Sequence, residues 1–299
     1  MQLFLIAILL AGVLTALVSG NNLSVSVGTA VGARIISRWT GILIGISGYI
    51  AGLLIEGESL KYAASALLPH SYYDISVAFT ISIAAFILAT FLRAPLSLTM
   101  VLVGSVIGIS IHAGKIPDQS FLILIVVMWV LSPLISIIIA YISNSIFIRK
   151  SPKDIWRTAI IMKSLLVGGS FFTSFTLGAN TLGFILNLIG GSGLAIAVMV
   201  SGIIIGSVFL SSGVIRRVGE EMYSMRYSSA TISLLSSALL VEIATVLGVP
   251  LSNSQTLSAS VMGSGLSYRF KAINARPFLL IVFTWIFSTL LGFLLGYVL

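Results

Sequence analysis

The sequence predicts an all-helical polytopic membrane protein, built from two inverted repeats of about five crossings each, with broken or re-entrant helices at its centre. Three observations lead to this fold class. Of the 299 residues, 58% are hydrophobic and only 8% are charged, whereas soluble domains carry about 25% charged residues. The apolar residues form runs long enough to cross a bilayer. Finally, short motifs recur at a nearly constant offset of 155 to 156 residues.

Most of the chain is predicted to form ordinary crossings, because a transmembrane helix needs about 20 mainly apolar residues. Eight runs qualify: Leu3–Val18, Trp39–Ile55, Ile75–Leu92, Phe121–Ile148, Ile155–Phe175, Leu194–Val214, Ser228–Leu247 and Phe278–Leu299. Four further segments mix apolar residues with Gly, Asn, Ser or Thr, and two of them begin just after a proline: Asn21–Ala33, Leu96–Ala113, Gly178–Gly193 and Leu251–Ser267. Irregular backbone inside a membrane is tolerated only where protein covers it or a cavity adjoins it. We therefore expect these four segments to be broken or re-entrant and to meet at the centre.

A duplication is indicated by identities that are not merely aliphatic. The stretch Ala94–Thr99 resembles Val249–Ser254 at an offset of 155 residues. At an offset of 156, Trp129 and Ser132 match Trp285 and Ser288. The predicted domains are a first membrane repeat over residues 1–148, a linker over 149–154 and a second repeat over 155–299.

The positions of the basic residues orient the repeats, because cytoplasmic loops are enriched in Lys and Arg. With the linker Arg149–Lys153 inside, thirteen of the sixteen Lys and Arg lie inside, Lys61 and Lys115 lie outside, and Lys163 lies within a span. Each repeat then has five crossings, and an odd number inverts the second half, as in many transporters. The prediction is a multi-pass protein of the cell membrane with both termini external.

Several function classes are excluded by composition. The net charge of +8 is spread over loops between apolar runs, so we expect no nucleic-acid partner. The chain has no cysteine, which excludes thiol chemistry and thiolate metal sites, and its two histidines leave little for metal or imidazole chemistry. The segment Gly190–Gly193 matches the Gly-x-Ser-Gly of intramembrane serine proteases, but no histidine follows His112 to act as base. We therefore predict neither an enzyme nor a bound cofactor.

The four unusual segments together predict an anion site. The start of a broken helix exposes N–H groups that carry partial positive charge, and Ser and Thr hydroxyls add further donors. Such ends from both halves would form a cage for a small tetrahedral oxyanion. The candidate substrate-binding residues are Asn21, Asn22, Ser97, Thr99, Asn180, Thr181, Ser252 and Ser254.

These segments resemble the inorganic phosphate transporter (PiT) family, which includes sulfate permeases. Gly20–Asn22 and Gly178–Thr181 resemble its Gly-Ala-Asn-Asp signature, and Pro95–Met100 and Pro250–Gln255 resemble its Pro-Val-Ser-Thr-Thr-His signature. The run Lys271–Asn274 is similar to its Lys-Ala-Val-Asn element. The resemblance covers nearly the whole chain. It implies symport of inorganic phosphate with sodium or protons by alternating access.

The sequence departs from that pattern at its charged positions. The signature aspartate is replaced by Asn22 and Thr181, and the histidine by Met100 and Gln255. Hydrogen phosphate carries an O–H that needs an acceptor, whereas sulfate carries none at neutral pH. A sulfate or other oxyanion permease is therefore the alternative, and a non-transporting sensor or scaffold is an alternative of another class.

Three further points stay open at this stage. No metal site is certain, but Asn21 and Asn180 are candidate ligands if sodium is the coupling ion. Glu242 lies within a predicted span, where charge is often functional, without a motif that assigns its role. The sequence also leaves open whether the protein forms a homodimer, as inverted-repeat carriers often do.

Overall fold

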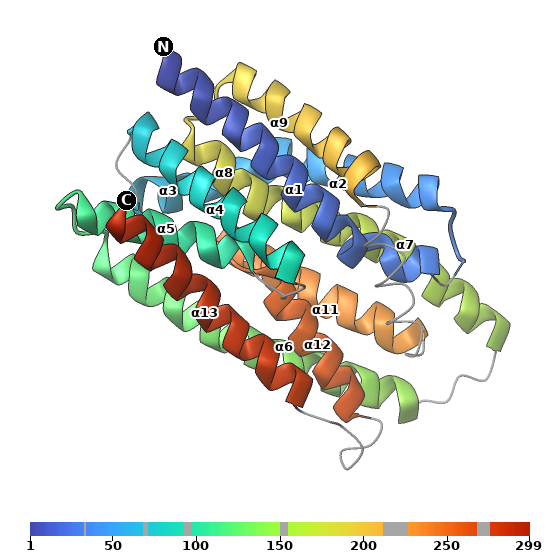
Figure 1. Cartoon of the computed structure of the whole chain (residues 1–299). Coiled ribbons are helices and arrows are strands. Elements are labelled where there is room, and N and C mark those ends of the chain that lie inside the picture. The colour runs from blue at the N-terminus through green and yellow to red at the C-terminus, as the bar shows by residue number, and fades with distance from the viewer. Residues whose placement is uncertain (33, 68–70, 93–96, 150–154, 212–226, 268–275) are drawn as a thin grey trace.

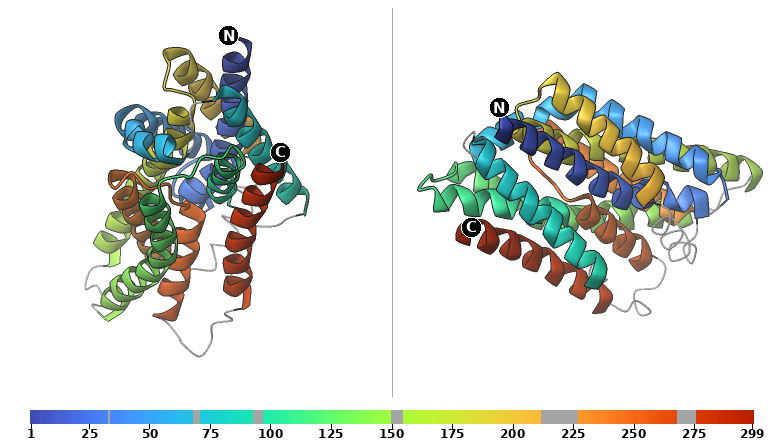
Figure 2. Two further views of the ribbon diagram at one scale, coloured as in Figure 1. Left: turned by 90° about the vertical axis from the view of Figure 1, so that its left-hand side faces the viewer. Right: turned by 45° about the horizontal axis from the view of Figure 1, so that its top comes forward.

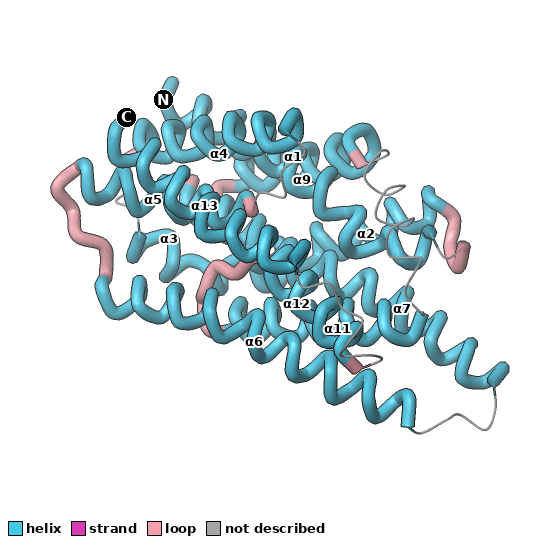
Figure 3. Tube along the Cα trace, turned by 60° about the horizontal axis from the view of Figure 1, so that its bottom comes forward, coloured by secondary structure: helices cyan, strands magenta, loops and turns pink. Residues whose placement is uncertain are grey.

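The computed structural model describes residues 1–32, 34–67, 71–92, 97–149, 155–211, 227–267 and 276–299, and within these ranges all regular structure is helical (Figures 1 and 3). The first half contains α1 (Gln2–Gly32), α2 (Arg38–Glu56), η1 (Gly57–Leu60), α3 (Lys61–Leu67), α4 (Tyr72–Leu92), α5 (Leu98–His112) and α6 (Gln119–Arg149). The second contains α7 (Ile155–Leu177), η2 (Gly178–Leu182), α8 (Gly183–Leu188), α9 (Gly193–Ile205), η3 (Gly206–Leu210), α11 (Tyr227–Val246), α12 (Asn253–Leu266) and α13 (Arg276–Val298).

The chain is a multi-pass membrane protein. Six described segments are long and apolar enough to cross a bilayer: Gln2–Gly32, Arg38–Leu67, Gln119–Arg149, Trp156–Leu188, Gly193–Leu210 and Ser228–Val246. Apolar side chains also cover the outside of the bundle, for example Val126, Val130 and Leu134 along α6. The predicted all-helical polytopic class is confirmed. Both termini lie at the same end of the bundle (Figures 1 and 2).

Helices of the two halves pack against each other in a reciprocal pattern. Helix α5 packs on α13, and its counterpart at the 155-residue offset, α12, packs on α6 (Figure 1). In the same way α1 packs on α9 while α7 packs on α2. Each helix of one half thus exchanges partners with its counterpart in the other. Such an exchange is what a two-fold relation between the two predicted repeats would produce.

The predicted break at Asn21–Ala33 is wrong, because α1 continues as one helix to Gly32. Within this segment the Ser26 hydroxyl donates to the Asn22 carbonyl of the same helix at 3.3 Å. Gly20 serves close packing instead of a break, since a Cβ there would lie 2.8 Å from the Gly206 carbonyl oxygen.

The other three unusual segments are irregular or short. Gly178–Leu182 forms a π-helical turn, η2, between α7 and α8. Helices α5 and α12 have 15 and 14 residues, fewer than the roughly 20 that span a bilayer. Both begin directly after a Pro-x-Ser sequence, and proline restricts the residue before it to extended backbone.

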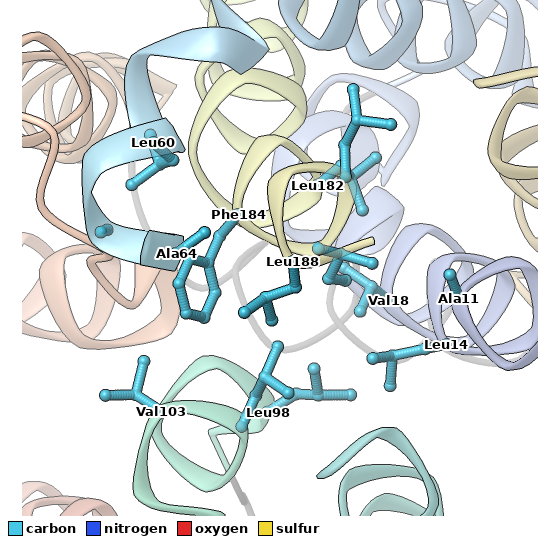
Figure 4. Close-up of a cluster of buried hydrophobic side chains, with 14 of the residues drawn as sticks. Ala11, Leu14, Val18, Leu60, Ala64, Leu98, Val103, Leu182, Phe184 and Leu188 are labelled. Atoms are coloured by element: carbon cyan, nitrogen blue, oxygen red, sulfur yellow. The ribbon is translucent and has the colours of Figure 1, made fainter. Parts of the chain in front are cut away.

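Two kinds of packing fix these short helices. Leu98 and Val103 of α5 face Leu14 and Val18 of α1 and Phe184 of α8 in one apolar cluster (Figure 4). The contact between α5 and α13 is instead made by glycines, which let two backbones approach closely. A Cβ added at any of four positions would lie 2.2–2.4 Å from a carbonyl oxygen of the partner helix: Gly104, Gly108, Gly292 and Gly296.

Candidate functional site

A cavity lies where the starts of α5 and α12 meet α1 and η2. Its volume is about 40 Å³, room for roughly three water molecules at 10–15 Å³ each. It is lined by Val18, Asn21, Asn22, Phe86, Ser97, Leu98, Thr99, Leu177, Thr181, Ser252, Asn253 and Ser254. Seven of the eight predicted site residues lie in this wall, Asn180 being the exception. They come from four elements far apart in the sequence.

The two short helices present their first turns to the cavity. Ser97 is the N-cap of α5, and its hydroxyl accepts from the Met100 N–H at 3.4 Å. It also donates to the Ser252 hydroxyl at 2.8 Å. Ser252 precedes α12 without capping it and bonds the Ser254 hydroxyl at 2.9 Å. The first N–H groups of a helix carry partial positive charge, so both helix starts favour an anion here.

The opposite wall comes from α1 and the π-helical turn. The Thr181 hydroxyl lies 3.5 Å from that of Thr99, which joins η2 to the first turn of α5. On α1, the Asn21 amide donates to the Asn22 side-chain oxygen at 3.4 Å. Single π-turns inside helices are frequent at functional sites, and η2 brings Thr181 to the wall.

Asn180 lies outside the cavity wall, and the structure gives it a positioning contact. Its amide donates to the Thr245 hydroxyl at 3.1 Å and the Val249 carbonyl at 2.9 Å. Its side-chain oxygen accepts from the Leu251 N–H at 2.9 Å. The Trp129 indole N–H donates to the Pro250 carbonyl at 3.0 Å from the α6 side. Asn180 and Trp129 thus hold the segment that leads into α12.

Asn253 is a wall residue that the sequence reasoning missed. Its side chain is 4% exposed, its oxygen accepts from the Ser237 hydroxyl at 3.1 Å, and its amide nitrogen has no hydrogen-bond partner. Its counterpart at the 155-residue offset is Leu98, which also lines the cavity. Its place between Ser252 and Ser254 was the signal, because every residue of a helix's first turn lies near the exposed N–H groups.

The cavity has no charged wall. None of its twelve lining residues is Asp, Glu, Lys, Arg or His, and no group of three His, Asp or Glu able to hold a metal occurs among the described residues. Its field therefore comes from helix ends, hydroxyls and amides, which suits a small anion. Glu242 lies outside this wall, on α11, with one carboxyl oxygen buried and unpartnered.

Comparison with known proteins places the whole chain among phosphate and sulfate permeases by similarity. The model of the phosphate transporter family matches residues 18–183 and 148–296. A proposed phosphate permease of Methanocaldococcus jannaschii is 28% identical over 291 residues, which covers 94% of this chain and 92% of that protein. The sulfate permease CysP of Bacillus subtilis is 30% identical over 264 residues, 84% of this chain and 73% of CysP.

One solved structure has the same fold. It is described as the sodium-dependent phosphate transporter, and it matches with a TM-score of 0.84 at 20% sequence identity. The match covers 100% of this chain and 99% of that one.

Proposed function

Because the chain belongs to the phosphate transporter family, we propose that it carries inorganic phosphate across the membrane as an ion-coupled secondary transporter. The observation that carries this proposal is the meeting of two helix starts, of α5 and α12, at one cavity without charged side chains. Helix N-termini are the standard protein site for phosphate-like anions. The proposed ligands are the seven predicted residues of the wall together with Asn253.

Alternating access about this cavity is the proposed mechanism. The reciprocal packing of α5 on α13 and of α12 on α6 supports two inverted repeats, and in such carriers the repeats rock about a central site. The Ser97–Ser252 hydrogen bond joins the two predicted repeats at this site. We also propose that both termini are external, in line with the distribution of basic residues.

Sodium is the coupling ion that the comparison favours, because the structural neighbour is described as sodium-dependent. Of the two candidate ligands, Asn21 lines the cavity. The Asn180 oxygen lies outside the wall and accepts the Leu251 N–H. We therefore propose Asn21 as a sodium ligand and Asn180 as a positioning residue.

A specific observation also favours a second candidate substrate, sulfate. The cavity wall contains no carboxylate, and the buried, unpartnered group of Asn253 is an N–H donor. A fully deprotonated oxyanion uses donors at every oxygen, whereas hydrogen phosphate needs one acceptor. The similarity to CysP, described as a sulfate permease, points the same way.

Uptake by the purified protein in liposomes tests both substrates. Labelled phosphate and labelled sulfate are offered under an imposed sodium gradient, an imposed proton gradient or neither, with protein-free liposomes as control. We expect gradient-driven phosphate accumulation. Accumulation of sulfate alone would assign the second substrate, and no accumulation of either by folded protein would overturn transport and favour a sensor or scaffold.

A further inference from the structure

A series of polar side chains, the hydroxyl track, runs from the cavity along one face of α12. Three helices contribute to it: Ser136 and Asn144 from α6, Ser229, Ser233 and Ser237 from α11, and Asn253, Thr256, Ser260 and Ser264 from α12. Every one of these side chains is buried.

Hydrogen bonds link the track step by step, some between side chains and others from a hydroxyl to a backbone carbonyl. The Ser136 hydroxyl donates to the Thr256 carbonyl at 2.6 Å, and the Ser233 hydroxyl donates to the Ser260 carbonyl at 3.2 Å. At the cavity, Ser237 bonds Asn253 at 3.1 Å and Thr256 at 2.7 Å. The middle is made by Ser136 with Ser260 at 2.5 Å and by Ser233 with Ser264 at 2.8 Å.

The far end of the track lies near the end of α6. There the Asn144 amide donates to the Ser264 carbonyl at 3.1 Å and the Ser267 hydroxyl at 2.6 Å. The Ser229 hydroxyl donates to the Asn144 oxygen at 3.2 Å. From Asn253 to Ser264 the helix rises roughly 16 Å, about half of a 30 Å hydrocarbon core. The exposed Arg149 ends α6 five residues beyond Asn144.

Buried serines in membrane helices often serve only as contacts between helices, but two observations separate this track from that role. First, it reaches the cavity at the wall residue Asn253, whose amide N–H is buried and has no partner. Second, the counterpart helix α5 has no such series among its described residues. Its Ser105 and Ser110 hydroxyls donate to backbone carbonyls, those of Leu102 and Leu67.

The two seams of α12, against α6 and against α11, are packed differently. Against α6 it is held by a glycine contact, since a Cβ at Gly263 would lie 2.2 Å from the Ile137 carbonyl oxygen. Helix α11 contains no glycine that could make such a contact with α12. That seam contains the Ser237–Thr256 and Ser233–Ser264 bonds. Hydroxyls can exchange these bonds for bonds to water or an oxyanion.

We propose that the oxyanion passes between the cavity and the Arg149 end of the bundle along the hydroxyl track, when α11 parts from α12. This inference rests on the proposed function. Serine hydroxyls can donate to the anion at each step. None of the track residues is cationic, so none binds the anion tightly enough to stop its movement, because conduction needs weak successive sites. Arg149 places a positive charge near the mouth.

The chain has no cysteine, so single cysteines can be tested without background. The variants are Ser260→Cys and Ser264→Cys in the track, with Ser82→Cys of α4 as matched control. Ser82 is also fully buried, but its hydroxyl bonds the Ala78 carbonyl of its own helix. Proteoliposomes are treated with a negatively charged thiosulfonate reagent.

We expect the reagent to modify both track cysteines and to abolish their uptake, with substrate slowing the reaction, while Ser82→Cys stays unmodified and active. Track cysteines as unreactive as Ser82→Cys would overturn the route. Uptake by the unaltered chain is measured first, so a failure of the proposed function is seen separately from a failure of the route. If the track cysteines are labelled but the unaltered protein takes up neither oxyanion, the proposed transport function is overturned. The separation of α11 from α12 would still stand, because the reagent reached the track.

A second variant keeps the test independent of cysteine chemistry. Ser264→Val removes one hydroxyl about 16 Å along the helix from the cavity. We expect a lower maximal uptake rate and an unchanged half-saturation concentration, because the cavity is intact. A raised half-saturation concentration at an unchanged maximal rate would overturn the route.

Discussion

The Ser97 hydroxyl donates a 2.8 Å hydrogen bond to the Ser252 hydroxyl, and these two residues stand at the same position of the repeated Pro-x-Ser motif, 155 residues apart. Counterpart residues of two halves related by a two-fold axis touch each other only at that axis. The pair is a direct contact between the two predicted repeats. The cavity wall includes both residues, so the candidate site lies at the same place.

Removal of either hydroxyl of this pair should weaken substrate binding. For Ser97→Ala and Ser252→Ala we expect the half-saturation concentration for uptake to rise about two- to tenfold, because one hydrogen bond contributes about 0.5–1.5 kcal/mol. Ser201→Ala is the matched control, since its exposed hydroxyl bonds only its own helix at Ala197. Normal uptake by both variants would show that neither hydroxyl binds the substrate.

The amide of Asn253 should set the preference between oxyanions. Asn253→Asp keeps the side-chain shape but replaces the N–H donor at the cavity with an acceptor oxygen. We expect sulfate uptake to fall more than phosphate uptake, because only the protonated phosphate can donate to that oxygen. Asn187→Asp is the control, because Asn187 bonds the Gly57 and Gly183 carbonyls away from the cavity. An unchanged ratio in Asn253→Asp would contradict a contact with substrate.

Loss of the Asn180 side chain should destabilise the protein. Asn180→Ala leaves the Leu251 N–H and the Val249 carbonyl without their partner, and each buried unsatisfied group costs about 1–3 kcal/mol. We expect a lower thermal unfolding midpoint in detergent. Lost uptake at an unchanged midpoint would instead place Asn180 among the substrate ligands.

The glycine contact between α5 and α13 should not tolerate a methyl group. A Cβ at Gly292 would lie 2.2 Å from the Val101 carbonyl oxygen, and overpacking of this kind costs about 1–3 kcal/mol. Gly168→Ala on α7 is the matched control, because no atom lies within 4 Å of its added Cβ. Gly292→Ala should lower the unfolding midpoint, and Gly168→Ala should leave it unchanged or raise it. An unfolding midpoint of Gly292→Ala equal to that of the unaltered protein would contradict this, because it would mean that α5 and α13 can move apart at little cost in free energy.

The start of α6 should depend on the ionised form of Asp118. Its carboxylate accepts from the Tyr62 hydroxyl at 2.7 Å and from the Ser120 and Phe121 N–H groups, and these bonds lower its pKa. Because the folded-state pKa is lowered, this stabilisation is present above the unfolded value of about 4 and is lost as pH falls through the folded pKa. Asp118→Asn should therefore lower the unfolding midpoint at pH 7, and the difference should shrink below about pH 4. A difference independent of pH would contradict this assignment.

Much of the fold class and part of the site follow from local chemistry. A charged fraction of 8% permits only a membrane protein, and the spacing of apolar runs marks most helices. The motif positions also predicted seven of the twelve residues that line the cavity. Motifs succeed here because both Pro-x-Ser sequences directly precede a helix, and in the first of them the serine hydroxyl also caps it.

The remaining features depend on contacts between distant segments. Gly20 and Asn21 look like a helix break in sequence, yet α1 continues because Gly20 packs against Gly206 of η3. Asn180 and Asn253 are both buried amides, and only their partners separate them: Asn180 binds the Val249–Leu251 backbone, whereas Asn253 keeps an unpartnered N–H at the cavity. A sequence shows which groups need hydrogen bonds, but which of them are satisfied is decided when helices 65 to 155 residues apart come together.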